Sequence, residues 1–267
     1  MIDSFNVIIP SAGNSSRFES DIPKQFQQLN GKLLINHSID KFLGFKECKN
    51  IVIPISGEKS YEEQILFEDR VTLVTGGSSR AESVKLGFDY LFSIDSRLNV
   101  LIHDAARPLN SQKIIKNIIK NLLEKNYDCV VPYTKCSDTA IVGHDNIDRE
   151  KLKLIKTPQG FIKKKITLLH NKNKRKSLTD DSQLFRNEKN KFKIKYLLQN
   201  EINLKITYQD ELVSLNKLVE KNILVGIGYD IHRTIRTNKS NILKLGGAKI
   251  KSKVKVISHS DGDVILH

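Results

Sequence analysis

The feature that most constrains the fold is a regular alternation of short apolar runs with longer amphipathic segments. Five runs rich in β-branched residues recur early in the chain: Phe5 to Ile9, Ile51 to Ile55, Val71 to Val74, Val100 to Ile102 and Cys129 to Val131. The segments between them have helical periodicity, most clearly residues 114–123, where Ile and Leu form one face. Strands that alternate with helices predict a doubly wound α/β fold around a mostly parallel sheet.

The alternation of predicted strands and helices is interrupted after the fifth apolar run. Residues 137–157 have mixed charge and little periodicity, so we expect an arm or hairpin outside the main sheet. Helices near 161–170 and 179–188, strands near 192–197 and 203–207, and a last helix at 210–220 are predicted next. A new apolar strand at 223–227 predicts a domain boundary, with a first domain of residues 1–218 and a second of residues 223–267.

The net charge of +14 raises the question of a nucleic-acid partner. The lysines at 163–165 and 172–176 lie among Asn and Arg, without interleaved aromatic residues that could stack on bases. We interpret them as solvated surface and expect no nucleic-acid partner. A positive field would still favour encounters with small anionic substrates.

The rest of the composition predicts a globular cytoplasmic protein. A hydrophobic content of 39% over 267 residues suffices for a buried core. No run approaches the roughly 18 apolar residues of a membrane span, and the N-terminus lacks the basic start of a signal peptide. We therefore expect no membrane association. The three cysteines are widely spaced, so we expect reduced thiols.

Ligands of doubly wound sheets bind at the carboxyl ends of strands, which directs attention to the loops there. The first loop runs from Pro10 to Phe18 and is followed by Pro23-Lys24-Gln25. Small residues such as Ala12 and Gly13 let backbone amides approach phosphate oxygens, and Arg17 and Lys24 supply positive charge. The loop is neither a Walker A motif nor a dinucleotide fingerprint, and by itself it equally fits an ordinary polar loop.

Two further loops follow predicted strands. The second, residues 76–84, contains paired glycines and several hydroxyls at the start of a helix, including Gly77, Ser78 and Ser83. The third is His103-Asp104-Ala105-Ala106-Arg107-Pro108. The Asp104 carboxylate suits magnesium, which prefers hard oxygen ligands, although alone it is as well explained as a helix cap.

In this order, the three loops resemble the signature of the 2-C-methyl-D-erythritol 4-phosphate cytidylyltransferases: a small-residue loop ending in Arg, then P-K-Q, G-G-x-x-R-x-x-S-V and H-D-A-A-R-P. Ser78 departs from the acidic residue that is common in the family. Further matches follow in the family's order: Asp138-Thr139, Arg149, Thr157-Pro158-Gln159, Thr179-Asp180 and Asn203 to Thr207. The resemblance covers roughly residues 2–218.

This resemblance implies transfer of CMP from CTP to 2-C-methyl-D-erythritol 4-phosphate, with release of pyrophosphate, in non-mevalonate isoprenoid precursor synthesis. It implies Mg²⁺ and a homodimer formed through the 137–157 arm. The implied catalytic residues are Arg17, Lys24, Arg149 and Lys205. The implied CTP-binding residues are Ala12, Gly13, Arg17, Lys24, Gly77, Ser78, Ser83 and Asp104, and those for the second substrate are Asp104, Arg107, Thr139, Arg149, Thr179 and Lys205.

Two alternatives fit the same motifs. The CTP loops would also serve a cytidylyltransferase that acts on another polyol phosphate, such as ribitol 5-phosphate. A non-catalytic nucleotide-binding module is the alternative from another class. The retained charged residues, Arg17 and Lys24 among them, argue against the second alternative.

The segment from Ile223 suggests different chemistry. Asp230 and His232 are two residues apart, so on a strand both side chains face one side, which suits adjacent metal ligands. A helix begun by Asp261-Gly262-Asp263 could carry His267 inward as a third ligand, although isolated histidines are more often structural. A dinucleotide site is rejected because Ile231 stands where the third glycine is needed.

The segment resembles the start of 2-C-methyl-D-erythritol 2,4-cyclodiphosphate synthases, with G-x-D-x-H and H-S-D-G-D-x-x-x-H motifs. The resemblance implies Zn²⁺ or another divalent metal on Asp230, His232 and His267, substrate contacts from His259 and Ser260, and trimeric contacts. We interpret residues 223–267 as a truncated start of this α+β domain in a bifunctional parent. We therefore expect its phosphorus–oxygen lyase activity in the parent and not in these 267 residues.

Overall fold

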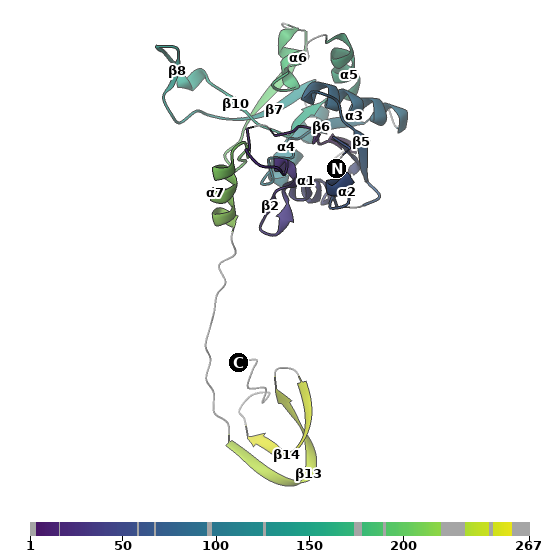
Figure 1. Ribbon diagram of the computed structural model, residues 1–267, viewed down its shortest axis with the longest axis vertical. Coiled ribbons are helices and arrows are strands. Elements are labelled where there is room, and N and C mark those ends of the chain that lie inside the picture. Colours follow the sequence, from purple (N-terminus) through teal and green to yellow (C-terminus); the bar gives the residue numbers. More distant parts are fainter. Residues whose placement is uncertain are drawn as a thin grey trace. The chain divides into compact units, whose positions relative to one another are not determined.

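The computed structural model describes residues 4–15, 17–57, 59–66, 68–94, 98–124, 127–173, 178–188, 191–219, 233–245 and 248–257. The chain divides into two compact units, Met1–Glu220 and Lys221–His267, and each is described by itself (Figure 1).

The first unit is built on one eight-stranded sheet. Its order is β10-β7-β11-β6-β1-β4-β5, with β12 beside β7. The strands are β1 (Phe5–Ile8), β4 (Cys48–Ile55), β5 (Val71–Thr75), β6 (Asn99–Ile102), β7 (Cys129–Thr134), β10 (Leu154–Ile155), β11 (Gln159–Phe161) and β12 (Ile194–Leu198). The pairs β1–β4, β1–β6, β4–β5 and β12–β7 are parallel, whereas β11 and β10 run antiparallel to their neighbours. The predicted doubly wound, mostly parallel sheet is confirmed.

Helices cover both faces of this sheet, as the alternation of buried side chains requires. Val7 packs in one core cluster with α1 (Leu34–Leu43) and α4 (Gln112–Glu124). The next residue, Ile8, points to the other face and packs with α3 (Arg80–Ile94), α5 (Lys163–Lys172) and α6 (Ser182–Asn187). The short helix α2 (Lys59–Glu62) precedes β5. Two apolar layers therefore cover the two faces of the sheet.

Close packing of α4 on β11 requires a glycine. A Cβ atom on Gly160 would lie 2.2 Å from Cγ2 of Ile118 and 2.9 Å from Cδ1 of Leu122. No side chain fits there without displacing the helix, because interiors are already packed to crystal-like density. The glycine lets α4 lie directly against the antiparallel strand.

A third apolar cluster packs α7 (Gln209–Val219) against the rest of the first unit near the hairpin of β2 (Gln28–Leu29) and β3 (Lys32–Leu33). The buried side chain of Ile206 belongs to this cluster, and its amide donates to the Ala106 carbonyl at 2.8 Å. The strand expected at 203–207 is wrong, because this segment is irregular and bonds to the loop after β6 rather than to a strand.

The arm expected at residues 137–157 is present in part. Strands β8 (Ala140–Val142) and β9 (Asp145–Ile147) form a separate two-stranded sheet that projects away from the main sheet (Figure 1). The turn η2 (Arg149–Lys151) follows, and β10 then returns to pair with β7. Ile141 and Val142 on the arm are 61% and 66% exposed.

Two helix predictions need adjustment at their ends. Phe161 ends β11, so α5 begins at Lys163 rather than 161, and α6 covers only Ser182–Asn187 of the expected 179–188.

The expectation that Lys163 is part of the solvated surface is wrong. Its side chain is buried and its ammonium donates at 2.6 Å to the carbonyl of Leu91, in the last turn of α3, where carbonyls lack helical partners.

In the second unit, β13 (Arg233–Leu245) and β14 (Ala248–Ile257) form an antiparallel pair. The strand expected at 223–227 lies outside the described residues. Within the described part of the chain, no helix has the length and apolar character needed to cross a membrane.

Candidate functional site

A cavity of about 710 Å³ opens where β1 and β6 end and α3 begins. The three loops singled out in the sequence meet there, together with a segment before α7. The lining residues are Pro10, Ser11, Ala12, Gly13, Asn14, Ser15, Arg17, Lys24, Gln25, Gly77, Ser78, Ser79, Arg80, Ser83, Asp104, Ala105, Ala106, Lys205 and Thr207. The cavity therefore lies at the edge where a doubly wound sheet binds ligands.

Gln25, in the short turn η1 (Lys24–Phe26), shapes the first loop. Its Nε2 donates to the carbonyls of Ser11 at 2.7 Å and Gly13 at 3.1 Å, and its Oε1 accepts from the Ser15 hydroxyl at 3.1 Å. A trans peptide places a carbonyl and the following amide on opposite sides. The amides of Ala12 and Asn14 therefore point away from Gln25, as a loop that receives an anion requires.

Lys24 brings positive charge to the same loop. Its amide donates to the Ser15 hydroxyl at 3.1 Å. Burial lowers the pKa of Lys24, and the neighbouring charges of Lys205 and Arg17 lower it further, against the opposing effect of Asp104. Cations that destabilise one another in this way gain most when an anion enters among them.

The second loop is folded around the start of α3. The Ser79 hydroxyl accepts from the Glu82 amide at 3.2 Å, which caps the helix. Glu82 in turn accepts from the amide and hydroxyl of Ser78, at 2.8 and 2.7 Å. The Gly77 amide donates to Ser83 Oγ at 3.1 Å. The loop's own side chains thus hold it against the start of α3.

The first and second loops touch at Gly76. A Cβ atom there would lie 2.3 Å from Cβ of Ala12 and 3.0 Å from the Ile55 carbonyl oxygen. Only glycine permits this approach, so the two loops form one continuous wall of the cavity.

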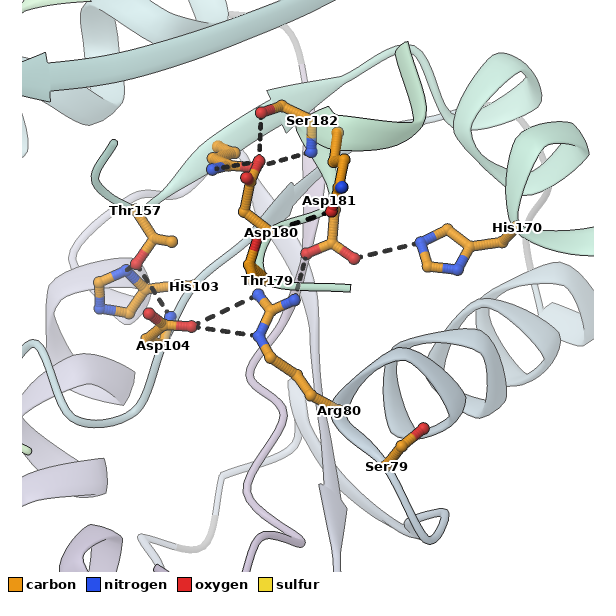
Figure 2. Close-up of polar contacts among 12 residues, drawn as sticks. Ser79, Arg80, His103, Asp104, Thr157, His170, Thr179, Asp180, Asp181 and Ser182 are labelled. Carbon is orange, nitrogen blue, oxygen red and sulfur yellow. Dashed lines mark hydrogen bonds and ion pairs between the residues drawn. The ribbon is translucent and has the colours of Figure 1, made fainter. Parts of the chain in front are cut away.

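Asp104 is the one carboxylate among the described lining residues, and it is surrounded by cations. Lys205 Nζ lies 2.9 Å from its Oδ2, Arg107 Nε 3.6 Å from Oδ2, and Arg80 3.4 Å from Oδ1. Burial alone would raise the pKa of Asp104, but these three cations hold it well below its usual range. Its amide donates to Thr157 Oγ1 at 3.0 Å (Figure 2).

His103 contacts the same Thr157 hydroxyl that accepts from the Asp104 amide. Its Nε2 lies 3.1 Å from the Arg107 carbonyl, which can only accept, and its Nδ1 lies 3.2 Å from the Thr157 hydroxyl. These partners select the neutral tautomer with the proton on Nε2. Burial lowers the pKa of His103 to about 4, despite the opposing charge of Asp104.

Comparison with protein families decides what kind of cavity this is. The model of the family described as "IspD: 2-C-methyl-D-erythritol 4-phosphate cytidylyltransferase" matches residues 5–221. The chain belongs to this cytidylyltransferase family. It is therefore a nucleotidyltransferase of the methylerythritol phosphate route, as the sequence motifs predicted. A second family model, described as the YgbB family, matches residues 223–267.

Known relatives of this cytidylyltransferase carry both parts. The bifunctional enzyme IspD/IspF of Pelagibacter ubique is 38% identical over 266 residues, which cover 97% of this chain and 67% of that protein. The bifunctional enzyme IspD/IspF of Wolbachia pipientis is 36% identical over 274 residues, which cover 97% of this chain and 68% of that protein. The solved bifunctional IspDF of Campylobacter jejuni has a TM-score of 0.68 at 28% identity, covering 99% of this chain and 68% of that one.

The cytidylyltransferase cavity brings together many of the residues predicted from sequence. Those that line it are Ala12, Gly13, Arg17, Lys24, Gly77, Ser78, Ser83, Asp104 and Lys205. Thr139 and Arg149 lie in the arm region, where Arg149 donates to the Ser137 carbonyl at 3.0 Å, and Thr179 precedes α6. These three do not line the cavity of the single chain. Asp230, His232, His259, Ser260 and His267 lie outside the described residues.

Arg107 differs from its predicted place. Its side chain is buried and does not line the cavity; its Nη1 donates to the Asn203 carbonyl at 2.8 Å. Asn203 in turn donates to the Thr157 carbonyl at 2.8 Å. Arg107 therefore joins the loop after β6 to the segment that carries Lys205.

Sequence reasoning missed two residues of this site. Arg80 lines the cavity and contacts Asp104, and Gln25 organises the first loop. Both lie inside motifs that carried the family resemblance, so the signal was present in the G-G-x-x-R and P-K-Q patterns. Their partners, however, are distant in sequence.

Enzymes of this family generally use divalent metals. Within the described residues, no group of three His, Cys, Asp or Glu side chains is arranged to hold one. Of the lining residues that the structure describes, Asp104 alone carries a carboxylate, and three cations already contact it. Such a donor set fits a metal held mainly by ligand phosphates, as is common for magnesium.

Proposed function

We propose that CTP and 2-C-methyl-D-erythritol 4-phosphate react in this cavity. The observation that carries the proposal is the convergence of Arg17, Lys24 and Lys205 on a loop of small residues at the sheet's carboxyl edge. Three cations and outward-facing amides suit a triphosphate better than a neutral ligand.

The reaction joins a phosphate oxygen of methylerythritol phosphate to the α-phosphorus of CTP. The bond from that phosphorus to the bridging oxygen breaks, and pyrophosphate leaves with its electron pair. Negative charge grows on the non-bridging oxygens and on the leaving group, so preorganised cations accelerate the step. No covalent enzyme intermediate is needed.

We assign roles by position in the cavity. Arg17, Lys24 and the amides near Ala12 and Gly13 would hold the triphosphate and stabilise the transition state. The loop with Gly77, Ser78 and Ser83 would receive cytosine and ribose. Lys205, held by Asp104, would bind the phosphate of the second substrate.

Mg²⁺ would bind to phosphate oxygens of CTP, with Asp104 as the carboxylate within reach. It would supply charge to the leaving pyrophosphate. Because Lys205 occupies Asp104 Oδ2 at 2.9 Å, direct ligation there requires a change of that contact. The chain's own cations therefore carry much of the charge stabilisation.

We further propose a homodimer in which the arm of one subunit completes the site of the other. Thr139 and Arg149 are predicted substrate residues but lie in the arm region, which projects from the main sheet (Figure 1). The exposed Ile141 and Val142 offer apolar surface for such contact. In the dimer, Arg149 of the partner subunit would reach the methylerythritol phosphate.

Pyrophosphate release tests the function. The protein with Mg²⁺ and CTP is assayed with methylerythritol phosphate, with ribitol 5-phosphate and with no acceptor. We expect release that depends on methylerythritol phosphate. A preference for ribitol 5-phosphate would select the alternative cytidylyltransferase, and nucleotide binding without release under any condition would contradict catalysis.

For the remainder of the chain, we propose a domain boundary between residues 218 and 223, with residues 223–267 belonging to a cyclodiphosphate synthase domain. An aspartate and two histidines, Asp230, His232 and His267, form a donor set that suits Zn²⁺. The metal would polarise a substrate phosphate. Metal analysis of the purified protein and of Asp230→Ala tests the assignment; equal zinc in both would contradict it.

A further inference from the structure

Behind Asp104 lies a line of buried polar contacts that the proposed chemistry does not use. Figure 2 shows its members in order: His170, Asp181, Arg80 and Asp104. His170 Nε2 donates to Asp181 Oδ1 at 3.2 Å, and Arg80 Nη1 donates to Asp181 Oδ2 at 2.7 Å. Arg80 Nε and Nη2 both reach Asp104 Oδ1 at 3.4 Å. The guanidinium thus bridges two carboxylates from different loops.

The burial of this line makes it costly unless every charge is paired. Asp181 is 0% exposed, His170 is buried against the ring of Phe88, and the Arg80 side chain is 25% exposed at the cavity wall. A buried ion pair adds little net stability compared with apolar packing of the same volume. Stability alone therefore does not explain why a charged group is held at this point.

The contacts on Asp104 are divided between its two oxygens. Arg80 takes Oδ1, whereas Lys205 takes Oδ2 at 2.9 Å. Arg107 also contacts Oδ2, at 3.6 Å, but is itself directed to the Asn203 carbonyl. Among these three described cations, Arg80 is the one paired with a second buried carboxylate.

We propose that Arg80 is a positioning residue for the transfer reaction. Asp181, backed by His170, fixes the guanidinium, which turns the Asp104 carboxylate so that its other oxygen holds Lys205 at the cavity. The inference rests on the proposed function and adds a link from the loop at Thr179 to the substrate cations. Misplacement of reacting groups by about 1 Å costs on the order of 100-fold in rate.

The decisive variant is Asp181→Asn, which keeps Arg80 and the shape of the loop but removes the charge that fixes the guanidinium. We expect kcat to fall about 10- to 100-fold, with the KM for CTP within about threefold of wild type. If Arg80 instead acted by touching CTP, releasing it from Asp181 would leave kcat unchanged or lower that KM. Either result in a folded protein would overturn the proposal.

A matched control is the ion pair next to Asp181, between Asp180 and Arg186 of α6. Arg186 pairs with Asp180 at 2.8 Å and does not contact Arg80 in the described structure. Arg186→Gln therefore removes an ion pair of similar geometry, and its kcat should stay within about twofold of wild type. A loss equal to that of Asp181→Asn would mean that general loosening of the loop explains the defect, and the proposal would fail.

Chemical rescue distinguishes a positioning role of Arg80 from a role in maintaining the fold. Arg80→Ala should regain kcat when guanidinium ion is added at millimolar concentration, since the vacated site opens on the cavity. Rescue expressed only as a lower KM for CTP would contradict a positioning role, as would no rescue. Pyrophosphate release by the wild type is measured in parallel. If the wild type releases none, the proposed function is wrong. If Asp181→Asn turns over at the wild-type rate, only the positioning role of Arg80 is contradicted.

If thermal melting shows Asp181→Asn to be unfolded, the charge-neutral double variant Arg80→Met with Asp181→Leu replaces it. This variant leaves no unpaired buried charge. A reduced kcat with an unchanged KM for CTP supports the proposal, and a wild-type kcat overturns it.

Discussion

Lys205 Nζ lies 2.9 Å from Oδ2 of Asp104, although the two residues belong to different loops. The contact joins the segment before α7 to the loop after β6. It places an ammonium beside the cavity that Arg17 and Lys24 enter from the opposite loop.

Removal of either cation of the first loop should abolish most turnover. Arg17→Ala and Lys24→Ala should each lower kcat by about 10²- to 10³-fold, or about 3 to 4 kcal/mol, because a charge that stabilises the transition state is lost. Pyrophosphate release measures the effect, and circular dichroism checks the fold. Lys116→Ala, an exposed lysine on α4, is the control and should stay at the wild-type rate. Wild-type turnover in Arg17→Ala or Lys24→Ala would remove that residue from the mechanism.

The alkaline limb of the pH profile should report Lys24. Burial and the charge of Lys205 lower its pKa, so kcat/KM for CTP should decline at a lower pH than an ordinary lysine would produce. In Lys24→Arg the guanidinium stays charged, so the limb should move to higher pH even if the rate is reduced. If the alkaline limb of Lys24→Arg stays at the wild-type pH, the titrating group is a residue other than Lys24.

The first loop should depend on the amide of Gln25. Gln25→Glu places a carboxylate oxygen against the carbonyls of Ser11 and Gly13, so we expect the KM for CTP to rise roughly 10- to 30-fold. Gln27, directly after η1, contacts Ser20 and Ile22, and Gln27→Glu serves as the control. Equal effects of the two substitutions would argue against a specific role for Gln25.

Acid should destabilise the fold through His103. Its pKa is lowered to about 4 in the folded state, while an unfolded histidine titrates near 6.5, so the unfolded state binds the proton first as the pH falls. The free energy of unfolding should therefore drop by about 3 kcal/mol between about pH 6.5 and 4 from this group. Urea titrations should show a flatter decline in His103→Gln than in wild type. His144→Gln, on the exposed arm, should leave the slope unchanged; a wild-type slope in both would contradict the assignment.

The active site proposed to be shared between two subunits predicts complementation. Arg149→Ala and Lys24→Ala proteins should each be inactive, but a co-refolded heterodimer has one site in which both residues are intact. A statistical mixture should regain about a quarter of wild-type turnover. Heterodimers verified by mass that stay inactive would show that each site is built from one chain.

The sequence by itself determined the architecture and the family. Short apolar runs predict the strands, and a 3.6-residue repeat predicts the apolar face of α4. Both patterns can be recognised from residues that are close together in the sequence. The loops after β1, β5 and β6 could be found because the carboxyl ends of parallel strands meet at one edge. Such properties depend on near neighbours along the chain.

Tertiary structure decided which polar groups meet. Arg80 with Asp181, Lys205 with Asp104, and Arg107 with Asn203 are pairs between distant segments, and their partners depend on how the layers pack. The same packing buries Lys163 and leaves residues 203–207 without a strand partner. A side chain's charge is local information, but the cost of burying it is set by what lies across the interface, and only the packed fold supplies that.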